Sequence, residues 1–281
     1  MLEGMQQGRT QEFQDTVLAF YHEHGRHDLP WRTPEADGSF DPYKIMVSEI
    51  MLQQTQVARV IPKFQAFLRL FPDFKSLAAA PLGDVLKAWS GLGYNRRAKF
   101  LWQAAGQVQQ EFGGQVPHSS HELVKLSGIG PNTAGAVLAY SCNIPSVFIE
   151  TNVRTVFIHH FFAGRQGISD RDILEVVARS LPEDARTWYW ALMDYGTHLK
   201  QTVGNLNKSS KHYTVQPRFV GSKRQIRGQV LRELGQGVRA ATYLAAVIPD
   251  ERLSQVLADL VQEGLVEMVD NCYKLPGAVL Q

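Results

Sequence analysis

Two glutamates have sequence surroundings that could give them chemistry. Glu49 lies inside the apolar run 45–52, and Glu150 directly follows an apolar stretch that ends at Ile149. A carboxyl in apolar surroundings loses solvation, so its pKa rises, and a glutamic acid that keeps its proton near neutral pH can serve as a general acid. The plainer alternative for Glu49 is an exposed helix glutamate, and for Glu150 a charge favoured at a helix N-terminus.

A tight turn with two glycines is the next pattern of interest. In the segment 126–137 (LSGIGPNTAGAV) one helix ends, the chain turns at Gly128 and Gly130, and a second helix starts at once. Glycines let backbone N–H groups face outward, so this loop and the following helix N-terminus could grip a phosphate oxygen without reading base sequence. Because such glycine spacing is a weak signal alone, a simple helix connection with a glycine cap is the alternative.

The elements that must position these groups are mostly helices. Between Glu12 and about Thr214, apolar residues recur at three- and four-residue steps, and Gly, Pro or Asn residues separate the segments. The clear helical segments are 13–24, 43–54, 57–69, 82–90, 96–112, 119–126 and 132–139. The predicted fold class is therefore mostly α.

The C-terminal part has a different organisation. A polar, positively charged stretch begins at Asn205, and we place a boundary near residue 218. Three predicted helices (226–234, 240–246 and 251–263) and two predicted strands (266–269 and 272–275) follow it. Three helices and a hairpin are typical of a winged helix, which could bind duplex DNA, bind a protein or pack against the rest of the chain.

Composition limits the classes of protein. With 281 residues and 44% apolar content, the chain can form one large or two unequal domains. No apolar run approaches the roughly 18 residues of a membrane span, and the N-terminus lacks a signal peptide, so we expect a cytoplasmic protein. Cys142 and Cys272 are the only cysteines, too few for a disulfide framework or a four-thiolate cluster. The histidines at positions 22, 24 and 27 do not share one helix face, so no catalytic metal is expected.

Five ordered motifs carry a resemblance to a known family. In the order and approximate spacing found here, the sequence resembles the MutY-type adenine DNA glycosylases of the helix-hairpin-helix (HhH-GPD) superfamily, over about residues 12–200. The motifs are 30–32 (PWR), 48–57 (SEIMLQQTQV), 89–98 (WSGLGYNRRA), 126–136 (LSGIGPNTAGA) and 193–196 (MDYG).

The resemblance implies a two-module glycosylase fold. It implies a six-helix barrel at about 44–148, and a second helical module built from 12–43 and 149–214, with the base pocket between the two. An N-terminal tail (1–11) would precede them, and a basic linker (215–224) and a small winged-helix-like domain (225–281) would follow. The implied activity is extrusion of a mispaired adenine from duplex DNA and hydrolysis of its N-glycosidic bond.

Roles for individual residues also follow from the resemblance. Glu49 matches the residue that protonates the purine N7 and handles the attacking water. Gln54 and Tyr94 match residues that wedge into the base stack. The base-pocket set is Arg32, Asn132 and Asn152, and the set that contacts or intercalates DNA is Gln53, Gln54, Tyr94, Gly128, Gly130 and Thr133. Taken singly, such residues are more often a surface arginine, a core tyrosine or a helix-capping asparagine.

Two residues depart from the family pattern at the reaction centre. Glu150 stands where the family has the aspartate that stabilises the oxocarbenium-like sugar. The extra methylene changes its reach by about 1.5 Å, and a misplacement on the order of 1 Å can cost roughly a hundredfold in rate. Asn132 stands where endonuclease III-type relatives carry a Schiff-base lysine, and an amide cannot form an imine. We therefore expect a monofunctional glycosylase that leaves the abasic site to a separate AP endonuclease.

Two further departures concern cofactor and substrate. The region after Gly196 lacks the four cysteines of the family's 4Fe–4S cluster, so we expect no cofactor. The family's large C-terminal domain that senses 8-oxoguanine is missing, so the sequence does not indicate which base must lie opposite the adenine. Positive residues could contact phosphate instead of a cluster loop, or could form a solubilising linker: Lys200, Lys208, Lys211, Arg218, Lys223 and Arg224.

The expected protein is thus a monomer that acts on duplex DNA with a mismatch or lesion, has no membrane partner, and is nucleoid-associated if bacterial. Two alternatives stay open. The same fold could excise another base, such as a mismatched thymine or a damaged purine, or the chain could be a catalytically impaired DNA-binding or damage-sensing protein.

Overall fold

The computed structural model describes residues 2–216 and 218–278, and it is helical apart from one small sheet. The prediction of a mostly α fold is confirmed. The chain divides into two compact units: the first comprises residues 1–45, 118–124 and 129–215, and the second comprises 46–117, 125–128 and 216–281. Within the described residues, no helix is long and apolar enough to cross a membrane.

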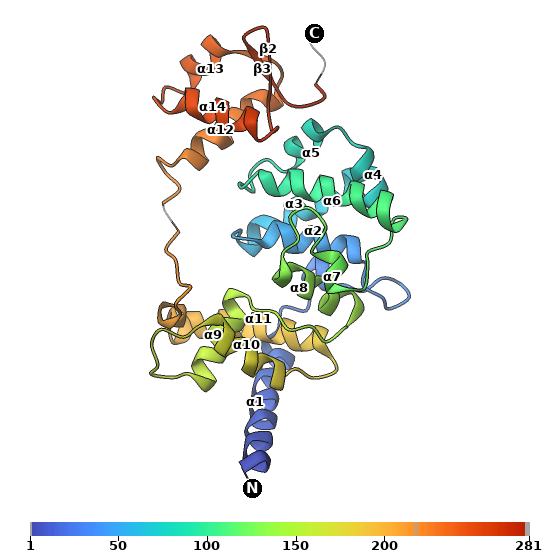
Figure 1. Cartoon of the computed structure of the whole chain (residues 1–281), viewed down its shortest axis with the longest axis vertical. Helices are drawn as coiled ribbons and strands as arrows, with labels where there is room; N and C mark the ends of the chain where they lie inside the picture. The colour runs from blue at the N-terminus through green and yellow to red at the C-terminus, as the bar shows by residue number, and fades with distance from the viewer. Residues whose placement is uncertain (1, 217, 279–281) are drawn as a thin grey trace. The chain divides into compact units, whose positions relative to one another are not determined.

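The first unit is organised around α11 (Ala185–Thr202), which packs against α1 (Leu2–His24), α8 (Pro131–Cys142) and α9 (Thr151–Phe161) (Figure 1). Its smaller elements are η1 (Pro30–Arg32), α7 (Ser120–Leu123), α10 (Asp170–Arg179) and η2 (Leu206–Ser209). Aromatic side chains fill its core: Phe148 stacks on Tyr189 with ring centroids 3.9 Å apart, and Trp188 is fully buried.

The second unit contains the helices α3 (Val57–Leu70), α4 (Phe74–Ala79), α5 (Leu82–Ala88) and α6 (Arg96–Phe112), while α2 (Pro42–Leu52) runs from the first unit into the second. Helix α6 has the predicted bounds, and a glycine cap ends it. Gly113 follows it in the left-handed conformation (φ 61°) and its N–H bonds to the carbonyl of Val108.

The C-terminal module is the part of the second unit from Lys223 onward. It comprises α12 (Lys223–Gly235), α13 (Ala241–Val247) and α14 (Leu253–Gln262) with the strands β1 (Arg239–Ala240), β2 (Glu267–Val269) and β3 (Cys272–Lys274). The strands form an antiparallel sheet in the order β1-β3-β2, and the hairpin turns at Asp270 and Asn271, both with positive φ. The predicted three helices and hairpin are present, and β1 is additional. The winged-helix assignment stays an interpretation.

The C-terminal module packs against α5 and α6 of its own unit, which is one of the three roles left open by the sequence. The N–H of Gly83 donates to the carbonyl of Pro276 at 2.9 Å, and the amine of Lys99 donates to the carbonyl of Glu263 at 2.6 Å. A Cβ at position 83 would lie 2.6 Å from the Pro276 oxygen, so the close approach requires glycine.

Two boundaries differ from the expected ones. Helix α1 begins at Leu2, so residues 2–11 of the predicted tail are helical, although their sequence shows no apolar period before Phe13. Residues 129–148 group with the first unit, not with the other helices of the expected barrel, because Phe148 packs on Tyr189 of α11.

Candidate active site and DNA interface

Glu150 occupies the position that begins α9. Its backbone is extended (φ −114°, ψ 167°), its carbonyl accepts the N–H of Arg154 at 2.8 Å, and its side chain makes no capping hydrogen bond. Glu150 is half-buried. Burial raises the pKa of Glu150, and the positive charge of Arg154 opposes that rise without cancelling it.

Two predicted base-pocket residues lie beside Glu150 in the first unit. The side-chain oxygen of Asn132, in the first turn of α8, accepts the N–H of Ile149 at 3.3 Å. Asn152, in the first turn of α9, donates from its amide to the carbonyl of Met193 at 3.2 Å and to the hydroxyl of Thr197 at 3.3 Å. The fold thus gathers Asn132, Glu150 and Asn152, while contact of either amide with a base stays a prediction.

Lys200 completes the environment of Asn152. Its amine donates to the Asn152 side-chain oxygen at 2.9 Å, and burial, aided by the charge of Arg154, lowers the pKa of Lys200. This lysine is thus engaged inside the protein, unlike the exposed Lys208 and Lys211 that were grouped with it. Gly196 allows the approach of α11 to α9, because a Cβ there would lie 2.5 Å from the carbonyl oxygen of Asn152.

Replacing Glu150 with glutamine should stabilise the protein at neutral and alkaline pH. A group whose folded pKa is raised favours folding at low pH, and that stability is lost as pH rises through the raised value. Glutamine imitates the protonated carboxyl at every pH. We expect the Tm of Glu150→Gln to exceed that of the wild type near pH 8 by a few degrees, since about 1 kcal/mol shifts Tm by roughly 2–4 °C at this chain length.

Calorimetry at several pH values tests this expectation, and the gain in Tm should shrink toward pH 4. The matched change Glu111→Gln, at an exposed position of α6, should leave Tm unchanged. A Glu150→Gln protein that is less stable than the wild type at pH 8 would show that the carboxylate is held by favourable partners.

Arg32, the third predicted base-pocket residue, belongs to a buried ion triad. Its guanidinium donates to both carboxylate oxygens of Asp194 at 2.8 and 3.0 Å, and Arg26 donates to the same carboxylate through its side chain and its backbone N–H. Arg32 is 7% exposed and Asp194 4%. These bonds tie the loop after α1 to α11 within the first unit. Arg26 was not predicted from the sequence, and contact of Arg32 with a base stays a prediction.

Glu49 and the wedge residues lie in the second unit. Glu49 is half-buried on α2 between the buried residues Ser48 and Ile50. Gln54 (φ 55°) and Tyr94 (φ 48°) are left-handed although neither is glycine. That conformation is uncommon for such residues, and backbone strain of this kind concentrates at functional sites. Gln53 is half-buried beside Gln54.

Arg97 holds the two wedge loops together, and the sequence analysis did not identify it. Its guanidinium donates to the carbonyls of Gln53 at 2.6 Å and Gly93 at 3.1 Å, and also to those of Ile50, Met51 and Leu92. Burial lowers the pKa of Arg97 to about 10, so it stays charged at neutral pH. The signal that could have found it is an arginine at the start of an amphipathic helix, on the apolar side.

The glycines of the hairpin have different structural reasons. Gly128 has a φ of 77°, and a Cβ there would lie 2.6 Å from the Cβ of Phe100. Gly130 is exposed with no atom near its absent Cβ, so internal packing does not require glycine there. Pro131 starts α8 directly after it, and Thr133 is half-buried in the first turn. The turn therefore has the local form that was predicted, and its grip on phosphate stays a prediction.

No metal centre is assembled by the described residues: residues 2–216 and 218–278 contain no group of three or more His, Cys, Asp or Glu side chains placed to hold a metal ion. The donor set also does not fit a 4Fe–4S cluster, since the chain has only two cysteines and Asn152 holds Lys200 in the region after Gly196.

Known proteins resemble this chain in sequence and in fold. The model of the HhH-GPD superfamily of base excision DNA repair proteins matches residues 47–183. The adenine DNA glycosylase of Mycolicibacterium smegmatis is 34% identical over 286 residues, which cover 92% of this chain and 95% of that protein. The adenine DNA glycosylase of Buchnera aphidicola (subsp. Baizongia pistaciae) is 42% identical over 149 residues, and the match spans 53% of this chain but only 41% of that protein.

A solved structure of a thermostable thymine-DNA glycosylase has the same fold, with a TM-score of 0.58 and 23% identity over 68% of this chain and 87% of that one. The mycobacterial similarity extends into the C-terminal module, whereas the Buchnera match covers about two fifths of that protein's length. The chain belongs to the adenine DNA glycosylase family of the HhH-GPD superfamily.

Proposed function

We propose that this protein excises adenine from mismatched duplex DNA by hydrolysis of the N-glycosidic bond. The observation that carries the proposal is similarity over nearly the whole chain to a mycobacterial adenine DNA glycosylase. The site residues support it, because Glu49 is present on α2 and a carboxylate, Glu150, is present at the start of α9.

In the proposed reaction Glu49 donates a proton to N7 of the extruded adenine. The C1′–N9 bond then breaks with its electron pair moving to the base, which leaves as a neutral molecule. The ionised carboxylate of Glu150 stabilises the positive sugar that remains. Water adds to C1′ and gives its proton to Glu49, which restores the enzyme. Asn152, fixed by Met193, Thr197 and Lys200, keeps the start of α9 in place for this step.

The proposed enzyme is monofunctional and works without an iron–sulfur cluster. The residue at position 132 is an amide, whose oxygen accepts the Ile149 N–H, and an amide cannot form an imine with the sugar. With two cysteines in the chain, four thiolate ligands are not available. We further propose that it acts as a monomer and that a separate AP endonuclease cuts the abasic product.

Single-turnover incubation with defined duplexes tests the proposal. The substrates contain adenine opposite 8-oxoguanine, adenine opposite guanine, thymine opposite guanine, or hypoxanthine, and alkali reveals abasic sites. We expect alkali-dependent cleavage at adenine, with little strand breakage before alkali. Cleavage at thymine or hypoxanthine alone would assign another substrate, cleavage of none would refute glycosylase activity, and breaks without alkali would refute the monofunctional assignment.

A further inference from the structure

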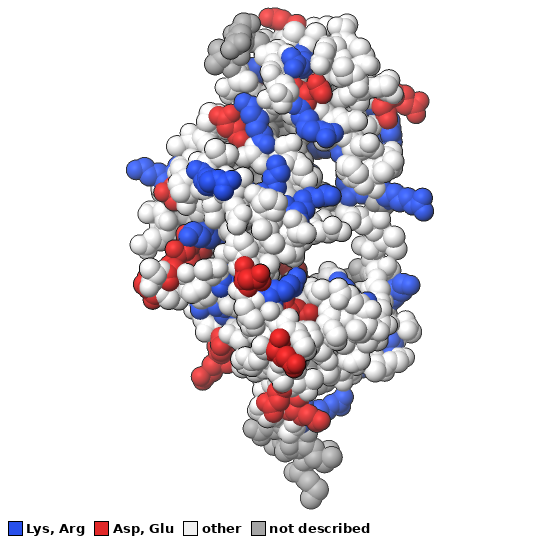
Figure 2. Space-filling model, turned by 180° about the vertical axis from the view of Figure 1, so that it is seen from behind, with Lys and Arg blue, Asp and Glu red and all other residues white. Residues whose placement is uncertain are grey.

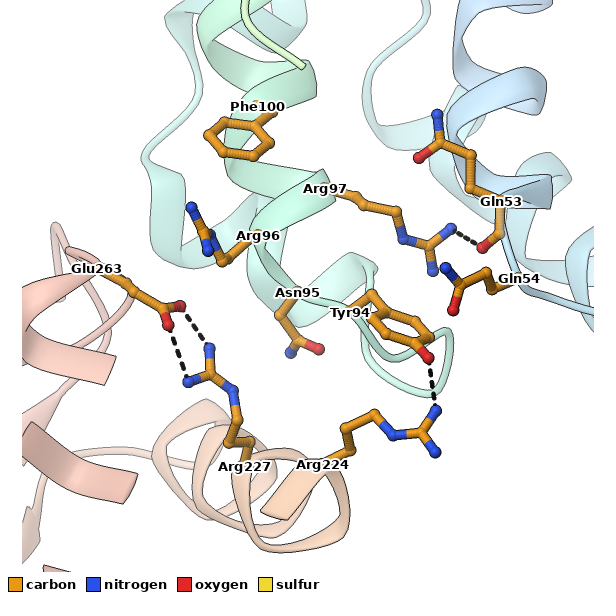
Figure 3. Close-up of a pocket in the computed structure, with 10 residues that line it drawn as sticks. All are labelled: Gln53, Gln54, Tyr94, Asn95, Arg96, Arg97, Phe100, Arg224, Arg227 and Glu263. Atoms are coloured by element: carbon orange, nitrogen blue, oxygen red, sulfur yellow. Dashed lines mark hydrogen bonds and ion pairs between the residues drawn. The ribbon is translucent and has the colours of Figure 1, made fainter. Parts of the chain in front are cut away.

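A cavity of about 460 Å³ lies in the second unit between the wedge loops, the start of α6 and the C-terminal module (Figure 3). The wedge residues Gln54 and Tyr94 line one side of it, and α12 lines the other. The charged residues that line it are four arginines and one carboxylate: Arg96, Arg97, Arg224, Arg227 and Glu263. The cavity is thus strongly positive.

Gln216, which precedes α12, and Arg224, in the first turn of α12, contact the strained wedge residues. The amide of Gln216 donates to the side-chain oxygen of Gln54 at 2.9 Å and also to the hydroxyl of Tyr94. Arg224 donates to the same hydroxyl at 2.6 Å, and its guanidinium lies 5.3 Å from the centre of the Tyr94 ring. Figure 3 shows Arg224 reaching from α12 to this hydroxyl. The C-terminal module therefore supplies part of the surface around the wedge.

The arginines of the cavity make different contacts. Arg227 forms a two-point ion pair with Glu263, at 3.1 and 2.5 Å. Arg224 donates to the uncharged Tyr94 hydroxyl, and exposed Arg96 lies over the ring of Phe100. The Nε of Arg97 is buried without a hydrogen-bond partner in residues 2–216 and 218–278. Lysine and arginine side chains also gather over the surface of the C-terminal module and the neighbouring helices of its unit in the view of Figure 2.

We propose that this cavity binds a phosphodiester group of duplex DNA next to the wedge, and that Arg224 of the C-terminal module and Arg96 of α6 are its ligands. The inference rests on the proposed function, because it requires that Gln54 and Tyr94 insert into a base stack of duplex DNA. Each base step is flanked by backbone phosphates, so arginines that border the wedge meet them when it enters the duplex.

Contact with a charged phosphate favours DNA binding. A phosphate oxygen that accepts a hydrogen bond from the Arg224 guanidinium adds the attraction of opposite charges to that bond. Release of counterions from the DNA adds a salt-dependent driving force. The module then contributes to affinity through phosphate contact, which does not depend on the identity of the opposite base.

The test is the salt dependence of binding to an adenine mismatch duplex. The full-length wild type is compared with Arg224→Ala, Arg224→Lys and the control Arg232→Ala, which removes a charge from an exposed position of α12 outside the cavity. The slope of log Kd against log salt should fall by about 1 in Arg224→Ala, as for one lost phosphate contact. Arg224→Lys and Arg232→Ala should keep the wild-type slope.

Three outcomes would overturn the inference: an unchanged slope in Arg224→Ala, an equal loss in Arg232→Ala, or tighter binding by Arg224→Ala, which would make the Tyr94 contact inhibitory. Circular dichroism and Tm of each variant separate loss of contact from loss of fold. Adenine excision by the wild type is measured on the same duplex. Excision with an unchanged Arg224→Ala slope refutes only the inference, whereas absence of excision refutes the proposed function whatever the slope.

Discussion

Replacing Asp194 with asparagine should cost about 3–5 kcal/mol of unfolding free energy, the usual cost of breaking a buried ion pair on one side. Arg26 and Arg32 both donate to this carboxylate, and Asp194 is 4% exposed. The neutral amide would leave two guanidinium groups without their anion, one of them buried. Asparagine and aspartate have nearly the same size, so the substitution leaves no cavity. The effect therefore comes from the lost charge.

Urea unfolding measures this cost, and its pH dependence gives a second check. Burial alone raises the pKa of Asp194, but the hydrogen bonds and charge of Arg32 and the hydrogen bonds of Arg26 outweigh it and hold the pKa below its ordinary value. The stability from this group is therefore present above the unfolded pKa, near 3.9, and is lost as pH falls through the lowered folded value. The difference between wild type and variant should shrink in acid.

The control for this variant is Asp184→Asn, the same chemical change at the exposed N-cap of the same helix. Asparagine caps helices about as well as aspartate, so its effect should be near zero. A loss of less than about 1 kcal/mol in Asp194→Asn would mean that the desolvation cost of the triad nearly cancels its attraction.

Replacing Glu49 with glutamine should reduce the single-turnover rate of adenine excision by about 10²–10⁴-fold, the range for removal of a general acid–base group. Glutamine preserves the shape of the half-buried side chain on α2 but can neither donate a proton to N7 nor accept one from water. Mismatch binding, measured separately, should change little because the wedge and phosphate contacts remain.

Glu111→Gln, at an exposed position of α6 in the same unit, is the matched control and should retain the wild-type rate. If Glu49→Gln retains more than a tenth of the wild-type rate, another group provides the proton. Glu150, whose pKa is raised by burial, would then be the first carboxyl to examine.

Local signals explain the success of the sequence predictions. Helix α6 was predicted with its observed bounds because the apolar spacing and the glycine at 113 agree within one short window. The hairpin of the C-terminal module was placed by Asp270 and Asn271, which suit a tight turn. The start of α9 was located by the change from apolar residues to Glu150, whereas the role of Glu150 followed from the family resemblance and stays a prediction.

Contacts between distant parts of the chain were beyond the reach of the same reasoning. The Arg32–Asp194 pair joins residues 162 positions apart, and the Arg224–Tyr94 contact joins residues 130 apart. Neither has a periodic or spacing signal. Helix α1 was predicted too short because residues 2–11 have no apolar period of their own. Lys200 was grouped with linker charges, since burial against Asn152 depends on the packing of α11 on α9.

The contact of Gly83 with Pro276 has a consequence for comparisons between relatives. A side chain at position 83 and the carbonyl of residue 276 would compete for the same space, with 2.6 Å between the Cβ and the oxygen. Residue 83 therefore acts as a marker: a relative with glycine there can seat a C-terminal domain in this way, and a relative with any larger residue must attach it differently. A single residue thus indicates how the C-terminal domain of a relative is attached.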